Sequence, residues 1–246
     1  MQDIVKLLFE LASVERLSLL MLINETPRRL SDISREVDIT TPEVSRQLNR
    51  LVSQKIVNKT SEGFYEVTPY GKLILQSLDV FNFLTKHRDY FASHNLTVIP
   101  PEFIHRLGEL KDSVMVEGVY RIINIQEKYM EETQSRLWTL SRQIFHRVFP
   151  VLEKLSGKSV DIRLILPKSI IETQQFKKLE QYGSHFTRFL EKVDLVIGVL
   201  DQAGGICFPS IEGNIDMSYM IGCTDQVSYK WLTDLHSYFW RKAETL

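Results

Sequence analysis

Apolar residues at the start of the chain recur with the three- and four-residue spacing of a helix. Between residues 4 and 24 this spacing is interrupted only around Ala12 and Ser13, which predicts one long helix or two abutting helices. The positions that carry the pattern are Leu8, Leu11, Leu17, Leu20 and Met21.

Residues 31–54 are predicted to form two helices joined by a short turn. Ser31 is a candidate N-cap for a short first helix. Thr41 is expected to cap the second helix, with Pro42 at the first helical position, where no N–H is needed. The second helix has an apolar stripe for the core, formed by Val44, Leu48, Leu51 and Val52. This order is that of a helix-turn-helix, whose second helix enters the major groove of DNA.

The segment after these helices has the pattern of a β-hairpin. Two short alternating stretches flank residues 61–63, Ser-Glu-Gly, and a hairpin in this place forms the wing of a winged helix. Lys59 and Ser61 are then expected near the sugar-phosphate backbone of DNA. Residues 72–94 are predicted to form a helix with more apolar positions than a surface helix of a monomer needs.

The remaining residues alternate between strand and helix patterns, after a break at Pro100-Pro101. The expected domains are therefore 1–95 and 96–246. Strands are expected at 113–117, 136–141, 159–167, 186–191, 193–201, 204–210 and 216–224. The fold class predicted is a two-domain α+β or α/β protein: an N-terminal winged helix-turn-helix and a C-terminal α/β sheet with mixed strands, parallel in its first half and antiparallel later.

Charge is balanced over the whole chain, with 30 basic and 31 acidic residues, so attraction to nucleic acid must come from a local patch. Residues 28–60 hold 7 basic against 4 acidic side chains, which is a small positive excess in the predicted helix-turn-helix. Cys207 and Cys223 lie in apolar surroundings and are expected to be buried thiols. No signal peptide or membrane-spanning segment is indicated, and we expect a cytoplasmic protein without a cofactor or metal.

Three segments resemble the ArsR-like winged-helix domain of prokaryotic transcription regulators. They are LASVERLSLLMLI, LSDISREVDITTPEVSRQLNRLVSQKIV and YEVTPYGKLIL, within residues 1–92. The resemblance implies a homodimer that binds a pseudo-palindromic double-stranded DNA operator through the helix at 41–54. No Cys-x-Cys motif occurs in that region, which argues against a metal sensor.

The second half resembles the effector domain of archaeal regulators of the methanogenesis and filamentation type. The similar features are TVIPPEFIHRLGEL followed by VEG, the strand DIRLILP, the turn from LVIGVLD to GGICFPS, and the closing KWLTDLHSYFWRKAETL. The resemblance implies that this domain senses a small molecule or mediates assembly.

The candidate DNA-binding residues combine the polar side of the second helix with its flanks. Arg, Gln and Asn side chains can make paired hydrogen bonds with base edges. Asn49 lies beside the main polar stripe and is expected to contact phosphate or water more than a base. The full set is Arg28, Arg29, Thr41, Pro42, Glu43, Ser45, Arg46, Gln47, Asn49, Arg50, Lys59 and Ser61.

An enzyme is disfavoured. None of the six histidines is followed two positions later by lysine, as a phospholipase D-like phosphodiesterase requires, and HExxH, GxSxG and GxxxxGK[ST] motifs are missing. No catalytic residue is therefore nominated. His87 and His94 are expected to share a helix face, but two imidazoles make a poor metal site.

A small-molecule effector is expected beyond the carboxyl ends of the parallel strands, where α/β sheets generally bind ligands. The candidate residues there are Ser141, Arg142, Lys168 and Asp201. Two hypotheses stay open: a dimeric DNA-binding regulator with a sensing domain, and an adaptor whose winged helix contacts only protein. A hydrolase fused to a DNA-binding domain is disfavoured by the motif search.

Overall fold

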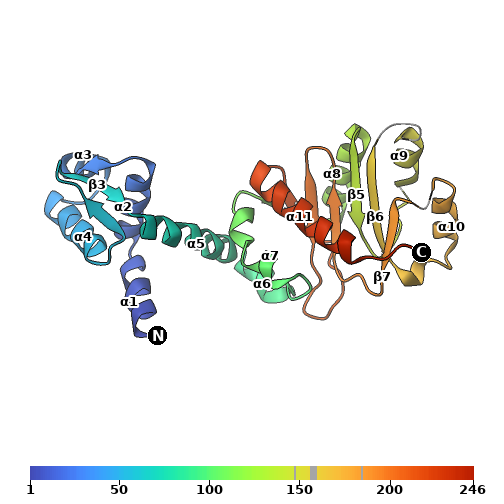
Figure 1. The fold of residues 1–246 in the computed structure, drawn as a ribbon, viewed down its shortest axis with the longest axis horizontal. Coiled ribbons are helices and arrows are strands. Elements are labelled where there is room, and N and C mark those ends of the chain that lie inside the picture. Colours follow the sequence, from blue (N-terminus) through green and yellow to red (C-terminus); the bar gives the residue numbers. More distant parts are fainter. Residues whose placement is uncertain (147, 156–159, 184) are drawn as a thin grey trace. The chain divides into compact units, whose positions relative to one another are not determined.

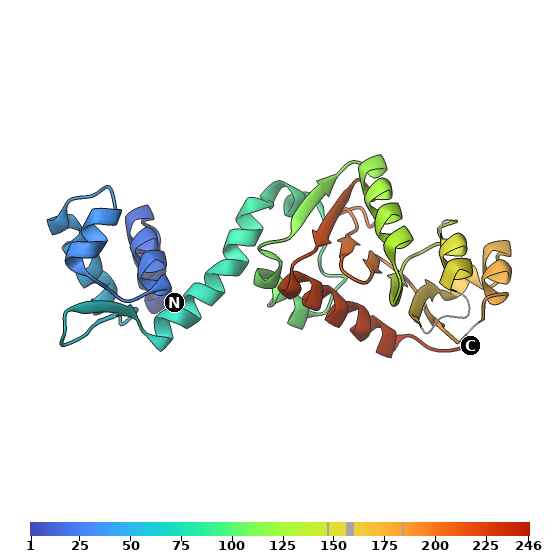
Figure 2. The same ribbon diagram turned by 90° about the horizontal axis from the view of Figure 1, so that it is seen from above.

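A computed structural model of the chain describes residues 1–146, 148–155, 160–183 and 185–246 (Figures 1 and 2). The chain divides into two compact units, Met1–Leu78 and Asp79–Leu246. The expected boundary at residue 95 falls inside the second unit, because Phe83 and Tyr90 belong to the same buried cluster as the sheet residues Trp138 and Ile197.

The first unit is a winged helix-turn-helix. Its elements are α1 (Gln2–Leu11), α2 (Val14–Glu25), β1 (Arg28–Arg29), α3 (Leu30–Glu36), α4 (Thr41–Ser53), β2 (Val57–Lys59), β3 (Phe64–Val67) and the start of α5 (Pro69–Lys86). The apolar pattern at the N-terminus thus forms two abutting helices. The strands form a small sheet in the order β1-β3-β2, in which β2 and β3 are the predicted hairpin.

Two helix starts differ from the prediction. The helix α3 begins at Leu30 with Arg29 as its N-cap, not at Ser31, because β1 pairs with β3 and holds the backbone extended up to Arg29. The helix α4 has Thr40 as its N-cap, so Pro42 follows the first helical residue Thr41. A proline is tolerated there because the first turn of a helix needs no N–H donor.

The core of the first unit is formed by the apolar sides of its helices and the hairpin. The predicted stripe of α4 is buried: Val44, Leu48 and Leu51 have no exposed surface. They pack with Leu19 and Leu20 of α2. The same cluster includes Leu11, Ile23, Ile33, Ile56, Val57, Tyr65, Val67, Ile74 and Leu75.

The helix predicted over residues 72–94 is divided at His87. Its first part is the end of α5, and α6 (Arg88–Ser93) follows, with His87 in a non-helical conformation between them. His87 and His94 therefore do not share one helix. His94 is buried and lies 3.3 Å from Asp216, through its Nε2.

The second unit is a seven-stranded mixed sheet in the order β4-β10-β9-β8-β5-β6-β7. The strands are β4 (Val114–Glu117), β5 (Arg136–Leu140), β6 (Asp161–Pro167), β7 (Thr187–Leu190), β8 (Val196–Val199), β9 (Gly204–Cys207) and β10 (Tyr219–Cys223). The neighbouring strands β5, β6 and β7 are parallel. Each neighbouring pair in the row β4-β10-β9-β8-β5 is antiparallel. The expected strands are confirmed, with β7 at the edge; residue 159 lies outside the described residues.

Helices cover both faces of this sheet (Figure 2). The helix α11 (Gln226–Lys242) packs on one face, where Trp231, Leu232 and Leu235 are completely buried. The other face is covered by α8 (Val119–Glu132), α9 (Val148–Leu155) and α10 (Gln174–Glu180). The remaining short helices are α7 (Pro101–Ile104) and the 3-10 turns at Leu107–Leu110 and Lys168–Ile170. Within the described residues, no helix is both long and apolar enough to cross a bilayer.

Candidate functional site

The outer side of α4 has a row of exposed polar residues. The apolar stripe fixes the helix against α2 and α3, so the opposite side is turned to solvent. Arg46 and Asn49 are exposed there, together with Thr41 and Pro42 at the start of the helix. Ser45 and Glu43 are half-buried.

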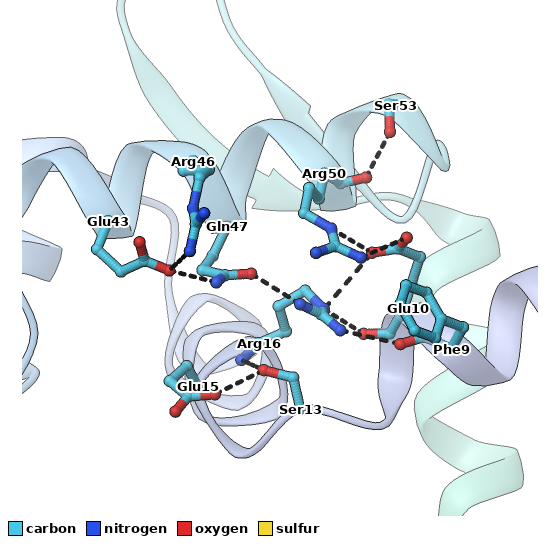
Figure 3. Close-up of polar contacts among 10 residues, drawn as sticks. All are labelled: Phe9, Glu10, Ser13, Glu15, Arg16, Glu43, Arg46, Gln47, Arg50 and Ser53. Carbon is cyan, nitrogen blue, oxygen red and sulfur yellow. Dashed lines mark hydrogen bonds and ion pairs between the residues drawn. The ribbon is translucent and has the colours of Figure 1, made fainter.

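Gln47 does not lie on this exposed row, contrary to the sequence prediction. Its side chain is only 6% exposed. The Oε1 atom accepts a hydrogen bond of 2.8 Å from Nη1 of Arg16, and Nε2 donates to Glu43 (Figure 3). A Gln in the middle of a helix can turn its amide along the helix surface, and here a buried guanidinium attracts it. Gln47 in this structure is a bridge inside the unit.

A polar network joins α1, α2 and α4 around Arg16 (Figure 3). Arg16 is 5% exposed and donates to the carbonyl oxygens of Phe9 and Glu10 as well as to Gln47. Arg50 donates two hydrogen bonds of 2.8 Å to the carboxylate of Glu10. Because Glu10 faces both guanidinium groups, one carboxylate on α1 fixes residues on α2 and α4.

The network shifts the pKa values of Glu10, Glu43 and Arg50 in the direction of their charged forms. The hydrogen bond from Arg50 lowers the pKa of Glu10, and the same contact raises the pKa of Arg50. Hydrogen bonds from Arg46 and Gln47 lower the pKa of Glu43. Glu10, Glu43 and Arg50 therefore stay ionised at neutral pH.

Ion pairs within the first unit neutralise several of its cationic side chains. Arg46 and Arg50 pair with Glu43 and Glu10, and Arg28 pairs with Glu25 and Glu36. Among the described residues of this unit, the cationic side chains without a carboxylate partner are Lys6 on α1, Lys72 on α5, and three on the hairpin sheet and the turn before it: Arg29, Lys55 and Lys59. Arg29 packs over Phe64 and Lys59 over Tyr65. Ser61, at the hairpin tip, is exposed.

Sequence reasoning missed Arg16 and Glu10. Both lie at the ends of apolar helical patterns, where a charged residue is ordinarily solvent-exposed. A partial signal was present, since Arg16 follows the N-cap Ser13 and breaks the apolar run of α2. The partners on α4 are 31 and 40 residues away, and only tertiary packing brings them together.

Two of the four candidate ligand residues of the second unit form ion pairs. Arg142 donates to the carbonyl oxygen of Val193 at 2.7 Å and pairs with Asp194. Lys168 pairs with Glu191 and Glu244.

Asp201 lies at the opposite end of the sheet from Ser141, which corrects the expectation that they share an edge. The reason is that β8 runs antiparallel to β5, so the carboxyl end of β8 meets the amino end of β5. There the Asp201 carboxylate accepts hydrogen bonds from the backbone N–H groups of Gln134, Ser135 and Arg136. Burial raises the pKa of Asp201, but these hydrogen bonds outweigh it and lower the pKa below its ordinary value.

A cavity of about 310 Å³ lies in the second unit, between α8 and the sheet. Of the four candidates only Ser141 lines it, and its hydroxyl donates to the carbonyl oxygen of Gln143. The other lining residues are mostly apolar, and they include Val116, Ile125, Met130, Val196, Leu200 and Met220. No local pattern of residues indicates this cavity, because its walls come from strands and a helix spread over more than a hundred residues.

The described residues contain no group of three or more His, Cys, Asp or Glu side chains arranged to hold a metal ion. Cys207 and Cys223 are buried free thiols, as expected. Burial raises the pKa of both thiols to about 12. They are therefore protonated and unreactive at neutral pH.

Comparison with known proteins gives one family match. Residues 5–88 match the model of the HVO_A0261 N-terminal domain, which covers the whole winged helix-turn-helix except its first residues. No curated protein matches the chain.

The solved structures that are similar to this chain include two with low TM-scores. TrmBL2, an archaeal chromatin protein whose structure is described as showing a novel mode of DNA binding, is 12% identical with a TM-score of 0.44, over 95% of this chain and 94% of that one. IdeR of T. acidophilum is 14% identical with a TM-score of 0.23, over 87% of this chain and 99% of that one. Likenesses at these TM-scores do not establish a common fold.

Proposed function

We propose that this protein is a DNA-binding transcription regulator whose first unit binds a double-stranded operator. The observation that carries the proposal is the exposed row Thr41, Arg46 and Asn49 on a helix fixed by its apolar stripe, beside a hairpin whose cations lack carboxylate partners. A helix of this kind fits the major groove, and the hairpin cations suit the phosphates beside it.

The residues of the proposed interface divide by role. Arg46 and Asn49 are exposed enough to contact base edges or the nearby backbone, and Arg46 would exchange its partner Glu43 for DNA. Arg29, Lys59 and Ser61 would contact phosphates. Gln47 and Arg50 act as positioning residues, because their polar atoms are engaged with Arg16 and Glu10.

We propose a homodimer as the DNA-binding form. The helix α1 exposes Ile4, Val5, Leu8 and Phe9, each at least half accessible to solvent, and only Leu11 of this helix is buried. A short helix with so much apolar surface is stabilised when a second copy covers it. The resemblance of the sequence to ArsR-like domains implies the same assembly, with two α4 helices presented to two half-sites.

The second unit would then be the effector domain, as its resemblance to archaeal methanogenesis and filamentation regulators implies. A ligand that binds one arrangement of the dimer better than another changes operator affinity by that difference in free energy. We propose no enzymatic activity for this unit.

The test is a binding experiment with the full chain. DNA would first be selected by the wild-type protein from a random-sequence library, and fluorescence anisotropy would then compare selected and random duplexes at several salt concentrations. Arg46→Ala is expected to lose affinity for selected DNA about tenfold more than for random DNA, since a paired base contact is worth roughly 1–3 kcal/mol. Lys59→Ala is expected to weaken both equally and to lower the salt slope by about 1.

Lys177→Ala is the control, because this exposed lysine on α10 removes the same charge from the second unit. It should leave both affinities unchanged. The ion pairs of Arg46 and Arg50 leave α4 with little free positive charge, which is the observation that favours a protein-binding adaptor instead. Failure of the wild-type chain to bind any duplex at low salt would support the adaptor.

A further inference from the structure

Three glycines form a continuous row across the centre of the second sheet. Gly222 of β10 pairs with Gly205 of β9, and Gly205 pairs with Gly198 of β8. Directly paired residues of antiparallel strands point to the same face, so the row continues to Thr139 of β5 on one side and to Val114 of β4 on the other. All five residues line the cavity, and the row is therefore its floor.

No side chain of the described residues covers the floor of the cavity at Gly198. A Cβ atom built on Gly198 would meet no other atom within 4 Å, whereas one on Gly205 would collide with the side chain of Met220. Gly in a strand interior weakens the strand and often marks a close approach of a ligand or another backbone. Here the space above Gly198 opens into the cavity, and no protein side chain fills it.

The helix α8 forms the wall opposite this floor. Arg121, Ile125 and Lys128 lie on one side of α8, at positions i, i+4 and i+7, and all three line the cavity. The two cations have no hydrogen-bond or ion-pair partner in the part of the chain that the structure describes. No Asp or Glu is among the described residues that line the cavity.

We propose that this cavity binds a small organic anion, with a flat apolar body on the glycine row and an anionic group in contact with Arg121 or Lys128. The volume of about 310 Å³ lies at the lower end of the range for ligand pockets, and pockets of this kind are mainly apolar with a few polar groups. The two cations are about 10 Å apart along the helix. A ligand carboxylate therefore contacts one of them directly and interacts with the other only through longer-range electrostatic attraction.

The polar side chains of the cavity floor further restrict which ligands would bind. The hydroxyl of Thr139 lies at the end of the glycine row and has no hydrogen-bond partner in the described residues, so it is available to a ligand. Ser141 offers less, because its hydroxyl already donates to Gln143. The inference gives a site and a chemical class to the ligand-sensing part of the proposed function, and it rests on that part.

Calorimetric titration of the full chain with 2-naphthoate and its uncharged isostere 2-naphthamide tests the proposal without DNA. Wild type should bind both, with 2-naphthoate about fivefold tighter at low salt, as expected for contact with a solvent-exposed cation. The double substitution Arg121→Gln with Lys128→Gln should remove this preference and leave 2-naphthamide affinity unchanged. Lys177→Gln, on α10, is the matched control and should keep the preference.

Substitutions at Gly198 test the floor. Gly198→Val should weaken both ligands by about tenfold or more, and Gly198→Ala by less, because the added atoms occupy the space that the aromatic body needs. Neither substitution meets a protein atom at Cβ, and cooperative thermal unfolding would verify that the sheet is intact. No heat of binding with either ligand, equal affinities for both, or wild-type affinity in Gly198→Val would overturn the proposal. Loss of DNA binding by the first unit would not affect this result, so the two proposals fail separately.

Discussion

The guanidinium of Arg50 on α4 is held by both carboxylate oxygens of Glu10 on α1, through Nε–Oε2 and Nη2–Oε1 contacts of 2.8 Å each (Figure 3). This two-point contact is the geometry in which an arginine gains the most from a carboxylate. The proposed DNA-contacting helix is therefore tied to the N-terminal helix that exposes an apolar surface. This ion pair therefore couples the position of α4 to the helix through which we propose dimerisation.

Glu10→Gln is expected to destabilise the first unit and to change its pH dependence. The pKa of Glu10 is lowered from its ordinary value of 4.5, chiefly by the hydrogen bond from Arg50. A carboxylate with a lowered pKa contributes stability that is complete above its ordinary pKa and is lost as pH falls toward the lowered value. Wild type should therefore lose stability below about pH 4.5, and Glu10→Gln should be less stable at pH 7 with a smaller further loss in acid.

Urea unfolding followed by far-ultraviolet circular dichroism measures this effect. Tryptophan fluorescence reports the second unit separately, because Trp138, Trp231 and Trp240 all belong to it. Glu62→Gln at the exposed hairpin tip is the control and should behave as wild type. An identical acid response in Glu10→Gln and wild type would show that the ion pair adds nothing to stability.

Gln47→Ala is expected to lower the stability of the first unit, whereas Asn49→Ala is expected to weaken DNA binding. Gln47 satisfies a buried guanidinium, so its loss leaves Nη1 of Arg16 without a partner and should destabilise the first unit by about 1–2 kcal/mol. Asn49 is exposed, and Asn49→Ala should leave stability within about 0.5 kcal/mol of wild type while weakening DNA binding. Hydrogen exchange of peptides from residues 41–53 measures the first effect. Unchanged protection in Gln47→Ala would mean that the Arg16–Gln47 bridge does not form in solution.

His236 is expected to make the second unit sensitive to mildly acidic pH. Burial lowers the pKa of His236 from 6.5 to about 4, and its Nε2 lies 3.2 Å from the carbonyl oxygen of Thr139. A histidine whose folded pKa is lowered destabilises the fold as pH falls below its ordinary value, because only the unfolded chain binds the proton readily. Between pH 7 and pH 5 the loss should be about 2 kcal/mol.

Tryptophan fluorescence is well placed to follow this transition, since the His236 ring stacks on Trp138 at a centroid distance of 5.2 Å. His236→Gln is expected to have much the same stability at both pH values, at the cost of a lower stability at pH 7. His105→Gln, at an exposed position, should retain the wild-type pH response. If the stability of His236→Gln fell with pH as steeply as that of wild type, the pH dependence would come from other titratable groups.

Leu8→Glu is expected to convert the proposed dimer into a monomer. Leu8 is 50% exposed on α1, and a carboxylate there would be costly to bury against a second copy. Light scattering after size-exclusion chromatography measures the mass, and operator affinity should fall in parallel. Gln2→Glu adds the same charge at an exposed polar position of α1 and should leave the dimer intact. A wild-type chain of monomer mass at micromolar concentration would refute dimerisation through α1.

The sequence by itself determined the order of the elements and most of their boundaries. Apolar residues at helical spacing fix which side of α4 is buried, and alternation with turn residues around Gly63 fixes the hairpin, because both signals arise from residues that are neighbours along the chain. The seven strands of the second unit follow from the same local patterns.

Only the tertiary structure decided which polar side chains of α4 are held by other helices. Gln47 and Arg50 have the same local pattern as Arg46, but Arg16 and Glu10 engage them from other helices. The strand pairing likewise placed Asp201 away from Ser141 and aligned Gly198, Gly205 and Gly222 into the floor of a cavity. Long-range hydrogen bonds and strand direction depend on how distant segments pack, and local spacing along the chain does not encode that directly.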